Sequence, residues 1–270
     1  SLVRADIRTE ADLVFVGTVG EEGLGDLRGA RHLFRANAPR IDSFIAVDAT
    51  TDEEITNTAI GSKRYRVTFS GPGGHSWSAF GNASPISALG RAIHLFDDAA
   101  ARFTSSGAAS SYNIGRIGGG TSVNAIAVQA WAEVDMRSES LDRLNALDSI
   151  FHNAMVNALN EQNAIRTSGP ELTLEARVVG NRPPGTTDPS SPIVQRAMAI
   201  ARALNLTPRL EGSSTDANVA IGRGIPAITI GRGGISAKNH SPVEYWINSN
   251  GTRGIRRILY TVLAEAGLKT

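Results

Sequence analysis

The chain has 270 residues, 27 lysine and arginine residues against 26 aspartate and glutamate residues, and no cysteine. This length predicts two domains with a substantial buried core, and a formal net charge of only +1 gives no support for the basic footprint of a nucleic-acid-binding protein. The lack of cysteine excludes disulfides, thiolate ligands and a thiol nucleophile, so any metal would be held by carboxylate and imidazole groups.

The first residues indicate the inside of a helix, because Leu2, Val3 and Ile7 have helical spacing and no capping residue precedes them. A truncated or clipped chain is expected at least as much as a native protein that begins in this way. Residues 1–15 carry no signal-peptide pattern, and no apolar stretch approaches the roughly 18 to 20 residues of a membrane-spanning helix. A cytoplasmic protein without a membrane partner is expected, and an exported form stays open.

The next segments predict an α/β layer. Residues 12–19 are apolar and β-branched and end in a glycine-rich turn, a pattern that predicts a buried strand. A helix over about 24–36 and a second buried strand that ends at Asp48 are expected next. Strand, helix and strand in this order predict a parallel layer with a right-handed crossover.

The middle of the chain has a different pattern, with an alternating strand first and a helix that Ser84 and Pro85 begin. The elements expected here are strand, helix, strand, strand, helix and strand. They cover residues 63–71, 85–102, 111–117, 123–138, 141–159 and 171–179. This order predicts a ferredoxin-like split domain.

The α/β pattern then returns. A proline-rich linker, a helix, an apolar run and a last helix are expected at residues 181–192, 192–204, 225–230 and 252–266. The sequence thus predicts one α/β domain formed by residues 1–60 and 180–270, interrupted by an inserted domain over residues 61–179.

Two adjacent carboxylates, Glu21 and Glu22, follow the first expected strand. Ligands of open α/β sheets bind beyond the carboxyl ends of strands. Because neighbouring carboxylates repel each other, one could ligate a metal while the other accepts a proton from metal-bound water. A solvated acidic turn explains this segment equally well.

Asp48 ends the next strand and could reach the same edge, although such an aspartate more often caps a turn. His240 lies in a loop, and its imidazole would complete a set that zinc, cobalt or manganese accepts. His75 lies among glycines on a tight turn, a place suited to contacting a substrate. The histidines on expected helices are interpreted as structural: His32, His94 and His152.

Five ordered segments resemble motifs of the M20 family of metallopeptidases and amidohydrolases. They are VGTVGEEGLGD, GGHS, GGTSVNAIAVQAWAEVDMR, GSSTDANVA and NHSPVEY. The resemblance implies a zinc-exopeptidase-like mixed sheet with helices on both faces and an inserted ferredoxin-like lid or dimerisation domain. It also implies hydrolysis of an amide bond in a small peptide or N-acyl amino acid, two divalent metal ions, with zinc before cobalt or manganese, and a homodimer through the inserted domain.

The resemblance also implies roles for residues at the expected metal centre. Glu21 resembles the general base that activates a water between the metals. Glu22 and His240 resemble ligands of one metal, and Asp48 resembles a ligand of the other.

The resemblance also implies roles for residues in the inserted domain and just after it. His75 and Asn124 resemble residues that contact the scissile carbonyl or the developing oxyanion, often across a dimer interface. Arg182 resembles an arginine that pairs with a substrate carboxylate, a task suited to its guanidinium fork. Asp135 and Arg137 fit a DMR pattern, for which we favour a structural role.

The sequence departs from the family at its beginning. Family members have a His-x-Asp motif and a metal-bridging aspartate before the glutamate pair, whereas only Asp6 and Asp12 and no histidine precede Glu21 here. An incomplete ligand set binds a divalent cation weakly. We therefore expect this chain to bind metal poorly and to be inactive by itself. A non-catalytic binding or dimerisation protein is the alternative.

Overall fold

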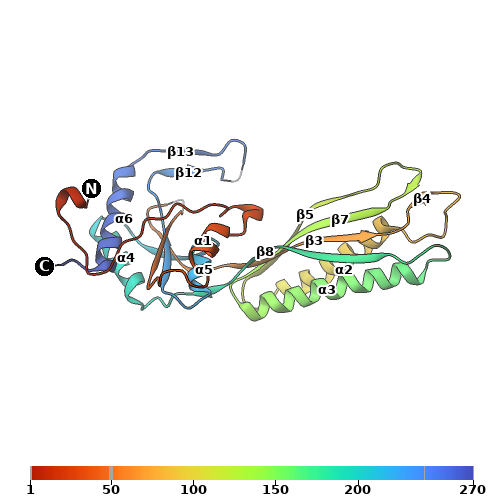
Figure 1. The fold of residues 1–270 in the computed structure, drawn as a ribbon, viewed down its shortest axis with the longest axis horizontal. Helices are drawn as coiled ribbons and strands as arrows, with labels where there is room; N and C mark the ends of the chain where they lie inside the picture. The colour runs from red at the N-terminus through yellow and green to blue at the C-terminus, as the bar shows by residue number, and fades with distance from the viewer. Residues whose placement is uncertain (1, 49–50, 240, 270) are drawn as a thin grey trace. The chain divides into compact units, whose positions relative to one another are not determined.

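The computed structural model describes residues 2–48, 51–239 and 241–269. The chain forms two compact units, unit 1 from Ser1–Ile60 and Pro183–Thr270 and unit 2 from Gly61–Arg182 (Figure 1). Both units contain strands and helices, so the α/β class expected from the sequence is confirmed. Within the described ranges, no helix has both the length and the apolar character needed to cross a membrane.

Unit 1 is built on a mixed five-stranded sheet. Its strands are β1 (Phe44–Val47), β2 (Glu54–Ala59), β9 (Gly185–Thr186), β10 (Arg209–Ser213) and β11 (Ala227–Ile230). Their order is β1, β11, β2 and β10, with β9 also paired to β2. β1 is parallel to β11 and β10 to β2, whereas β11 and β2 are antiparallel. Strands from distant parts of the sequence therefore share one sheet.

Helices cover both faces of this sheet. They are α1 (Arg28–Leu33), α4 (Pro192–Ala203), α5 (Ala217–Ile221) and α6 (Gly251–Ala266). α1 and α5 contribute to the apolar layer that contains Ala46 and Ala227, and α4 and α6 to the layer that contains Ile55 and Ile228. Because both faces are covered, every residue of β11 is buried.

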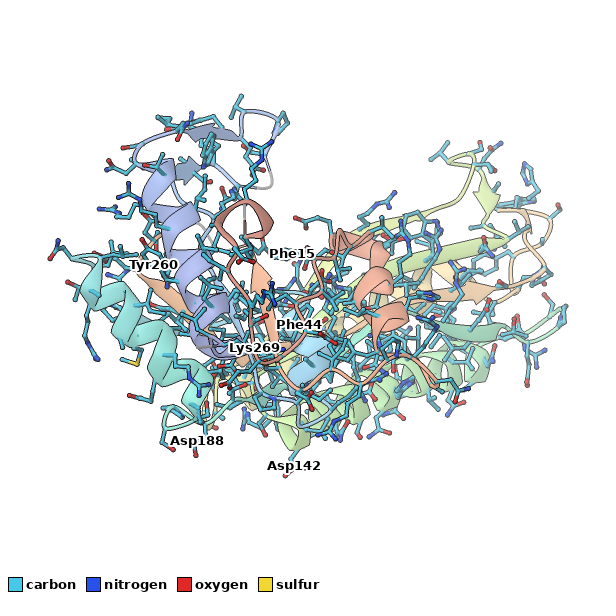
Figure 2. All side chains as sticks on the ribbon, turned by 60° about the vertical axis from the view of Figure 1, so that its left-hand side comes forward. Phe15, Phe44, Asp142, Asp188, Tyr260 and Lys269 are labelled. Atoms are coloured by element: carbon cyan, nitrogen blue, oxygen red, sulfur yellow. The ribbon has the colours of Figure 1, made fainter. Side chains whose placement is uncertain are left out.

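The prediction of a first strand over residues 12–19 is wrong. These residues form no strand, and the side chains of Val14 and Phe15 are 77% and 78% exposed (Figure 2). An apolar run becomes a buried strand only where a neighbouring strand can take up its backbone hydrogen bonds. The parallel layer expected from this run is therefore also wrong, since β1 pairs with β11 instead.

Two helices near the N-terminus are shorter than expected. The first residues form only the 3-10 turn η1 (Val3–Ala5). In place of a helix over 24–36, the 3-10 turn η2 (Gly23–Gly25) precedes α1. Asp26 and Leu27 separate the two with φ angles of 51° and 58°. Such left-handed residues cannot continue a right-handed helix.

Unit 2 is a four-stranded antiparallel sheet with two long helices on one face (Figure 1). Its elements in chain order are β3 (Gly61–Ser70), α2 (Pro85–Thr104), β5 (Ser110–Gly119), β7 (Gln129–Ser138), α3 (Leu141–Ala164) and β8 (Thr173–Arg182). The strand order is β5, β7, β3 and β8. This arrangement confirms the ferredoxin-like topology.

The two helices of unit 2 begin where the sequence predicts. The Ser84 hydroxyl accepts a hydrogen bond from the Ser87 amide at 3.3 Å, and the Ser140 hydroxyl accepts one from the Arg143 amide at 3.4 Å. Both serines satisfy an amide that has no partner inside the helix. The apolar stripe of α3 then packs Phe151 into the core.

The long strand expected over 123–138 is interrupted. β6 (Ala125–Ile126) pairs with β4 (Gly74–His75), and only β7 continues the main sheet. The Gly71 amide donates to the carbonyl of Val128, which lies between β6 and β7. The chain therefore leaves the main sheet at this point and forms a separate two-stranded ribbon.

Two smaller features complete the fold. The expected linker over 181–192 contains the boundary between the two units, and it also contains the end of β8 and the strand β9. β12 (Ile235–Ala237) and β13 (Tyr245–Ile247) form an antiparallel pair that the sequence did not predict.

Candidate functional site

The two-stranded ribbon of unit 2 brings His75 and Asn124 next to each other. His75 on β4 lies opposite Ala125 on β6, and the Ser76 amide donates a hydrogen bond of 2.9 Å to the carbonyl oxygen of Asn124. Both candidate side chains are exposed. Residues that are far apart in the sequence are thus neighbours at one end of the unit.

Glycine is required in the turn that presents His75. Gly74 has a φ of 131°, and a Cβ atom at this position would lie 2.5 Å from the Cβ of Ala79. A side chain would therefore be excluded both by its own backbone conformation and by its neighbour. The GGHS segment is thus explained by the path that the backbone takes into β4.

The orientation of His75 determines which ring nitrogen can donate. The backbone amide of Trp77 donates to Nδ1 of His75 at 3.2 Å. In the neutral imidazole one nitrogen is a donor and the other an acceptor, so Nδ1 is unprotonated and Nε2 carries the hydrogen. His75 therefore presents an N–H donor to a group that approaches Nε2.

Large apolar residues lie close to His75 and Asn124 in the sequence, and their side chains are also exposed. Trp77 and Phe80 are each 86% exposed, and Val123 is fully exposed. Several exposed apolar side chains close together are typical of a surface that contacts a ligand or another protein. The ribbon thus combines polar donors with apolar contact area.

The glutamate pair lies in unit 1, before η2. The carbonyl oxygen of Glu22 accepts a hydrogen bond of 2.9 Å from the Gly25 amide, which closes the 3-10 turn. Glu21 is half-buried and Glu22 is exposed. The hydroxyl of Thr18 donates to Oδ2 of Asp216 at 2.6 Å. This contact ties the segment before the pair to the start of α5.

Asp216 directly precedes α5, but its side chain makes no capping hydrogen bond. Its carboxylate accepts from Thr18 instead. At this end of α5, Oδ1 of Asn218 accepts a hydrogen bond from the Thr215 amide at 2.9 Å. A contact with a residue far away in the sequence has replaced the local cap.

Asp48 directly follows β1, as the sequence predicts. Its amide donates to the carbonyl of Ile230 at 3.1 Å, which extends the pairing of β1 with β11. Nη1 of Arg232 donates to the Asp48 carbonyl at 3.1 Å and lies 3.8 Å from its Oδ1. The carboxylate therefore lies at the carboxyl end of a strand and next to a cation of the protein itself.

The described residues do not by themselves form a metal site. His240 lies outside them, and no three histidine, aspartate or glutamate side chains within the described ranges come together as a ligand set. The roles of Glu21, Glu22 and Asp48 stay predictions.

Arg182, the candidate for binding a substrate carboxylate, is the last residue of β8. It lies opposite Ser62 of β3, and only 4% of it is exposed. Its role toward a substrate stays a prediction.

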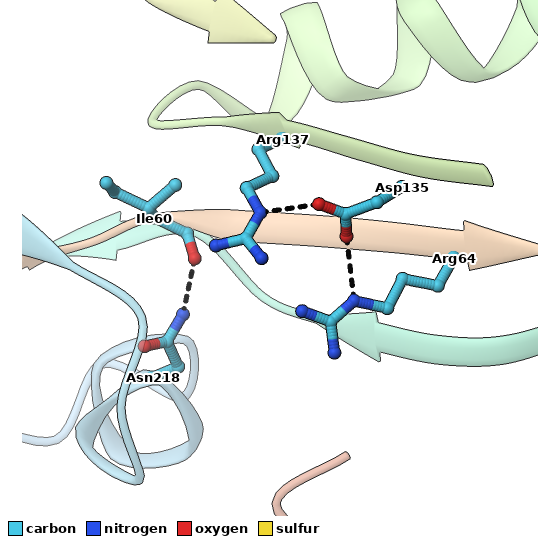
Figure 3. Close-up of polar contacts among 5 residues, drawn as sticks. All are labelled: Ile60, Arg64, Asp135, Arg137 and Asn218. Carbon is cyan, nitrogen blue, oxygen red and sulfur yellow. Dashed lines mark hydrogen bonds and ion pairs between the residues drawn. The ribbon is translucent and has the colours of Figure 1, made fainter. Parts of the chain in front are cut away.

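A charged network lies on the sheet of unit 2. Oδ1 of Asp135 accepts from Nε of Arg64 at 2.7 Å, and Oδ2 accepts from Nε of Arg137 at 2.6 Å (Figure 3). Burial raises the pKa of Asp135, but the hydrogen bonds and charges of the two arginines outweigh it and hold this pKa below its usual value. These contacts support the structural role expected for Asp135 and Arg137.

In unit 1, one polar side chain contacts both residues that are joined in sequence to unit 2. The side-chain amide of Asn218 is buried and donates to the carbonyl of Ile60 at 2.8 Å (Figure 3). It also donates to the carbonyl of Pro183 at 3.0 Å. One side chain therefore holds both segments of unit 1 that lead to and from unit 2.

Asp135 is expected to make the stability of unit 2 depend on pH. A carboxylate with a lowered pKa in the folded state stabilises it above the unfolded pKa of about 3.9, and this contribution is lost as the pH falls through the folded value. Asp135→Asn should therefore lower the free energy of unfolding by about 1–2 kcal/mol at pH 7 and by much less under strongly acidic conditions. Urea unfolding at a series of pH values measures the difference.

Asp12→Asn is the control for this experiment, since it removes an exposed carboxylate with the same change of charge. If Asp135→Asn and Asp12→Asn have the same pH profile, the account of the Asp135 network is wrong.

Comparison with known proteins identifies unit 2. Residues 57–163 match the family model M20_dimer, described as a peptidase dimerisation domain. The match includes β3, α2, β5, β7, nearly all of α3 and the ribbon with His75 and Asn124. A comparison with curated proteins finds no match.

Solved structures share the fold of the whole chain. The aminopeptidase PepT from Bacillus cereus superposes with a TM-score of 0.71 at 22% identity, over 98% of this chain and 67% of that one. A tripeptidase from Staphylococcus aureus gives 0.71 at 21% identity, over 92% and 63%. An amidase of the hydantoinase/carbamoylase family from Burkholderia vietnamiensis gives 0.63 at 15%, over 85% and 57%. The chain thus spans about two thirds or less of these structures.

Proposed function

We propose that this protein, whose residues 57–163 belong to the M20 peptidase dimerisation family, is a hydrolase that cleaves an amide bond in a small peptide or N-acyl amino acid. The match confirms the family resemblance found in the sequence. The observation that carries the proposal is the ribbon that places His75 and Asn124 side by side with exposed polar side chains.

The chemistry of amide hydrolysis requires such donors. Negative charge develops on the carbonyl oxygen when water attacks, and N–H groups that are already in place stabilise it. Nε2–H of His75 and the Nδ2 group of Asn124 would donate to this oxygen. Glu21 would accept the proton of the attacking water as general base. The exposed Trp77 and Phe80 would contact apolar parts of the substrate or its surroundings.

The proposed reaction also involves two divalent metal ions, with zinc before cobalt or manganese. This part of the proposal rests on the family resemblance, and the ligands that go with it are Glu22, Asp48 and His240. We further propose a homodimer formed through unit 2, which the description of the matching domain supports. Light scattering after size-exclusion chromatography measures this association.

The 270-residue chain is expected to retain less than one zinc ion after dialysis, because an incomplete ligand set holds a divalent cation weakly. Elemental analysis of the dialysed chain measures the occupancy, with the product of the complete gene as comparison. Two tightly held ions per chain would show that this chain by itself supplies a complete set of metal ligands.

The function is tested by incubating the product of the complete gene with dipeptides, tripeptides and N-acyl amino acids in the presence of zinc, cobalt or manganese. Release of a free amino group from one of these classes supports the hydrolase. A folded dimer that binds such compounds but cleaves none of them would favour the alternative, a non-catalytic binding protein.

A further inference from the structure

The side-chain amide of Asn124 is held by a neighbouring residue, Ser122, to which the proposed function assigns no role. The hydroxyl of Ser122 lies 2.5 Å from Oδ1 of Asn124. Such a short distance is typical of an O–H···O hydrogen bond and lies below the range of N–H···O bonds. Ser122 therefore donates, and the carbonyl oxygen of the amide accepts.

The backbone around this contact is also held in place. The Ala125 amide donates to the Ser122 carbonyl at 3.3 Å, which closes a turn, and the Asn124 carbonyl accepts from the Ser76 amide at 2.9 Å. Ser122 and Asn124 are thus fixed relative to each other and to the strand that carries His75. The side-chain contact restrains the torsions of the Asn124 side chain, which the backbone bonds of the turn do not restrain.

An amide side chain has one acceptor and one donor end. When its oxygen is bonded to Ser122, the Nδ2 group is the end that remains for a ligand. The same holds for His75, because the backbone amide of Trp77 donates a hydrogen bond to Nδ1 and leaves Nε2–H as the donor. Both side chains of the ribbon therefore have a local contact on the acceptor atom and a donor available for substrate.

We propose that Ser122 is a positioning residue, whose hydroxyl holds the amide of Asn124 so that Nδ2 donates to the oxygen of the reacting carbonyl. This inference rests on the proposed function. Asn124 is exposed, so without the contact its side chain would rotate freely and would have to be ordered at each turnover. Ordering a free side chain weakens its contribution by about threefold to tenfold.

The test uses the product of the complete gene and a substrate that it hydrolyses. Ser122→Ala should lower kcat by about threefold to tenfold with little change in KM, because the contact matters most when charge develops on the oxygen. Ser122→Thr keeps the hydroxyl and should restore most of the rate. Ser149→Ala removes an exposed hydroxyl from α3 and should leave the rate unchanged.

A double-mutant cycle separates positioning from a general structural role. Ser122→Ala should have no further effect in a protein that already carries Asn124→Ala. If the serine substitution lowers kcat equally in both backgrounds, or leaves kcat unchanged in the parent, the proposal is wrong.

A second measurement does not depend on activity. In the 270-residue chain, the NMR signals of the Asn124 side-chain amide can be assigned by their loss in Asn124→Ala. Their order parameter should fall in Ser122→Ala and not in Ser149→Ala. Absence of hydrolysis in the parent would refute the proposed function, whereas an unchanged order parameter would refute the positioning role by itself.

Discussion

Replacing His75 by alanine is expected to lower kcat for amide hydrolysis by about 100-fold to 1,000-fold, the effect of removing one donor from an oxyanion site. The reason is that Trp77 fixes the tautomer in which Nε2 carries the hydrogen, so that the ring is already arranged as a donor. KM should change much less than kcat, because the developing charge needs the donor more than the neutral carbonyl does. Steady-state kinetics of the product of the complete gene measure both values.

His94→Ala is the matched control, since His94 lies on α2 of the same unit with an exposed ring near Asp98. It should leave kcat within about twofold of the parent, in keeping with the small effects of most surface substitutions. Equal kcat values for His75→Ala and the parent would exclude His75 from the reaction.

Replacing Phe151 by alanine is expected to lower the free energy of unfolding by about 3–5 kcal/mol. Phe151 is fully buried, stacks on Tyr65 with ring centroids 4.8 Å apart and meets the edge of Phe96 at 5.5 Å. The substitution would remove a ring that joins α3 to both β3 and α2. Urea unfolding followed by circular dichroism measures the loss.

Val156 on the same helix provides the comparison, because 46% of it is exposed. Val156→Ala should change the free energy of unfolding by at most about 0.5 kcal/mol. If the two substitutions had the same effect, the packing of α3 on the sheet would not be the main source of stability of unit 2.

Unit 2 could be predicted from the sequence because its pattern is local. Each strand alternates, each helix has an apolar stripe, and Ser84 and Ser140 provide caps next to the helices that they begin. The order of the elements then restricts the topology to few possibilities. The break between β6 and β7 was missed, since the residues on either side of it continue to look like a strand, and the short strand β4 was missed as well.

Unit 1 was predicted less well because its strands depend on distant partners. The run over 12–19 has the composition of a buried strand but no strand beside it within the described residues. β2 has the opposite property, since Thr56 and Asn57 are polar and yet buried. The side-chain Nδ2 of Asn57 donates to the carbonyl of Thr187 at 2.8 Å, a contact that the local sequence could not reveal.

The candidate site was predicted residue by residue but not in its arrangement. His75 stood out because glycines surround it, and Asn124 was found through the family resemblance. Their neighbourhood follows from the pairing of β4 with β6, which no periodicity indicated. Ser122 was missed, although it precedes Asn124 by only two residues, because a serine in a turn carries no signal of its own.

In the proposed reaction, His75 and Asn124 together bind the oxygen of the reacting carbonyl. A crystal structure of the product of the complete gene with a phosphinic peptide, whose tetrahedral phosphorus imitates the attacked carbonyl, tests this claim most directly. A phosphinyl oxygen is expected about 2.7–3.1 Å from Nε2 of His75 and from Nδ2 of Asn124. A bound analogue whose oxygens contact other groups, while both side chains face solvent, would contradict it.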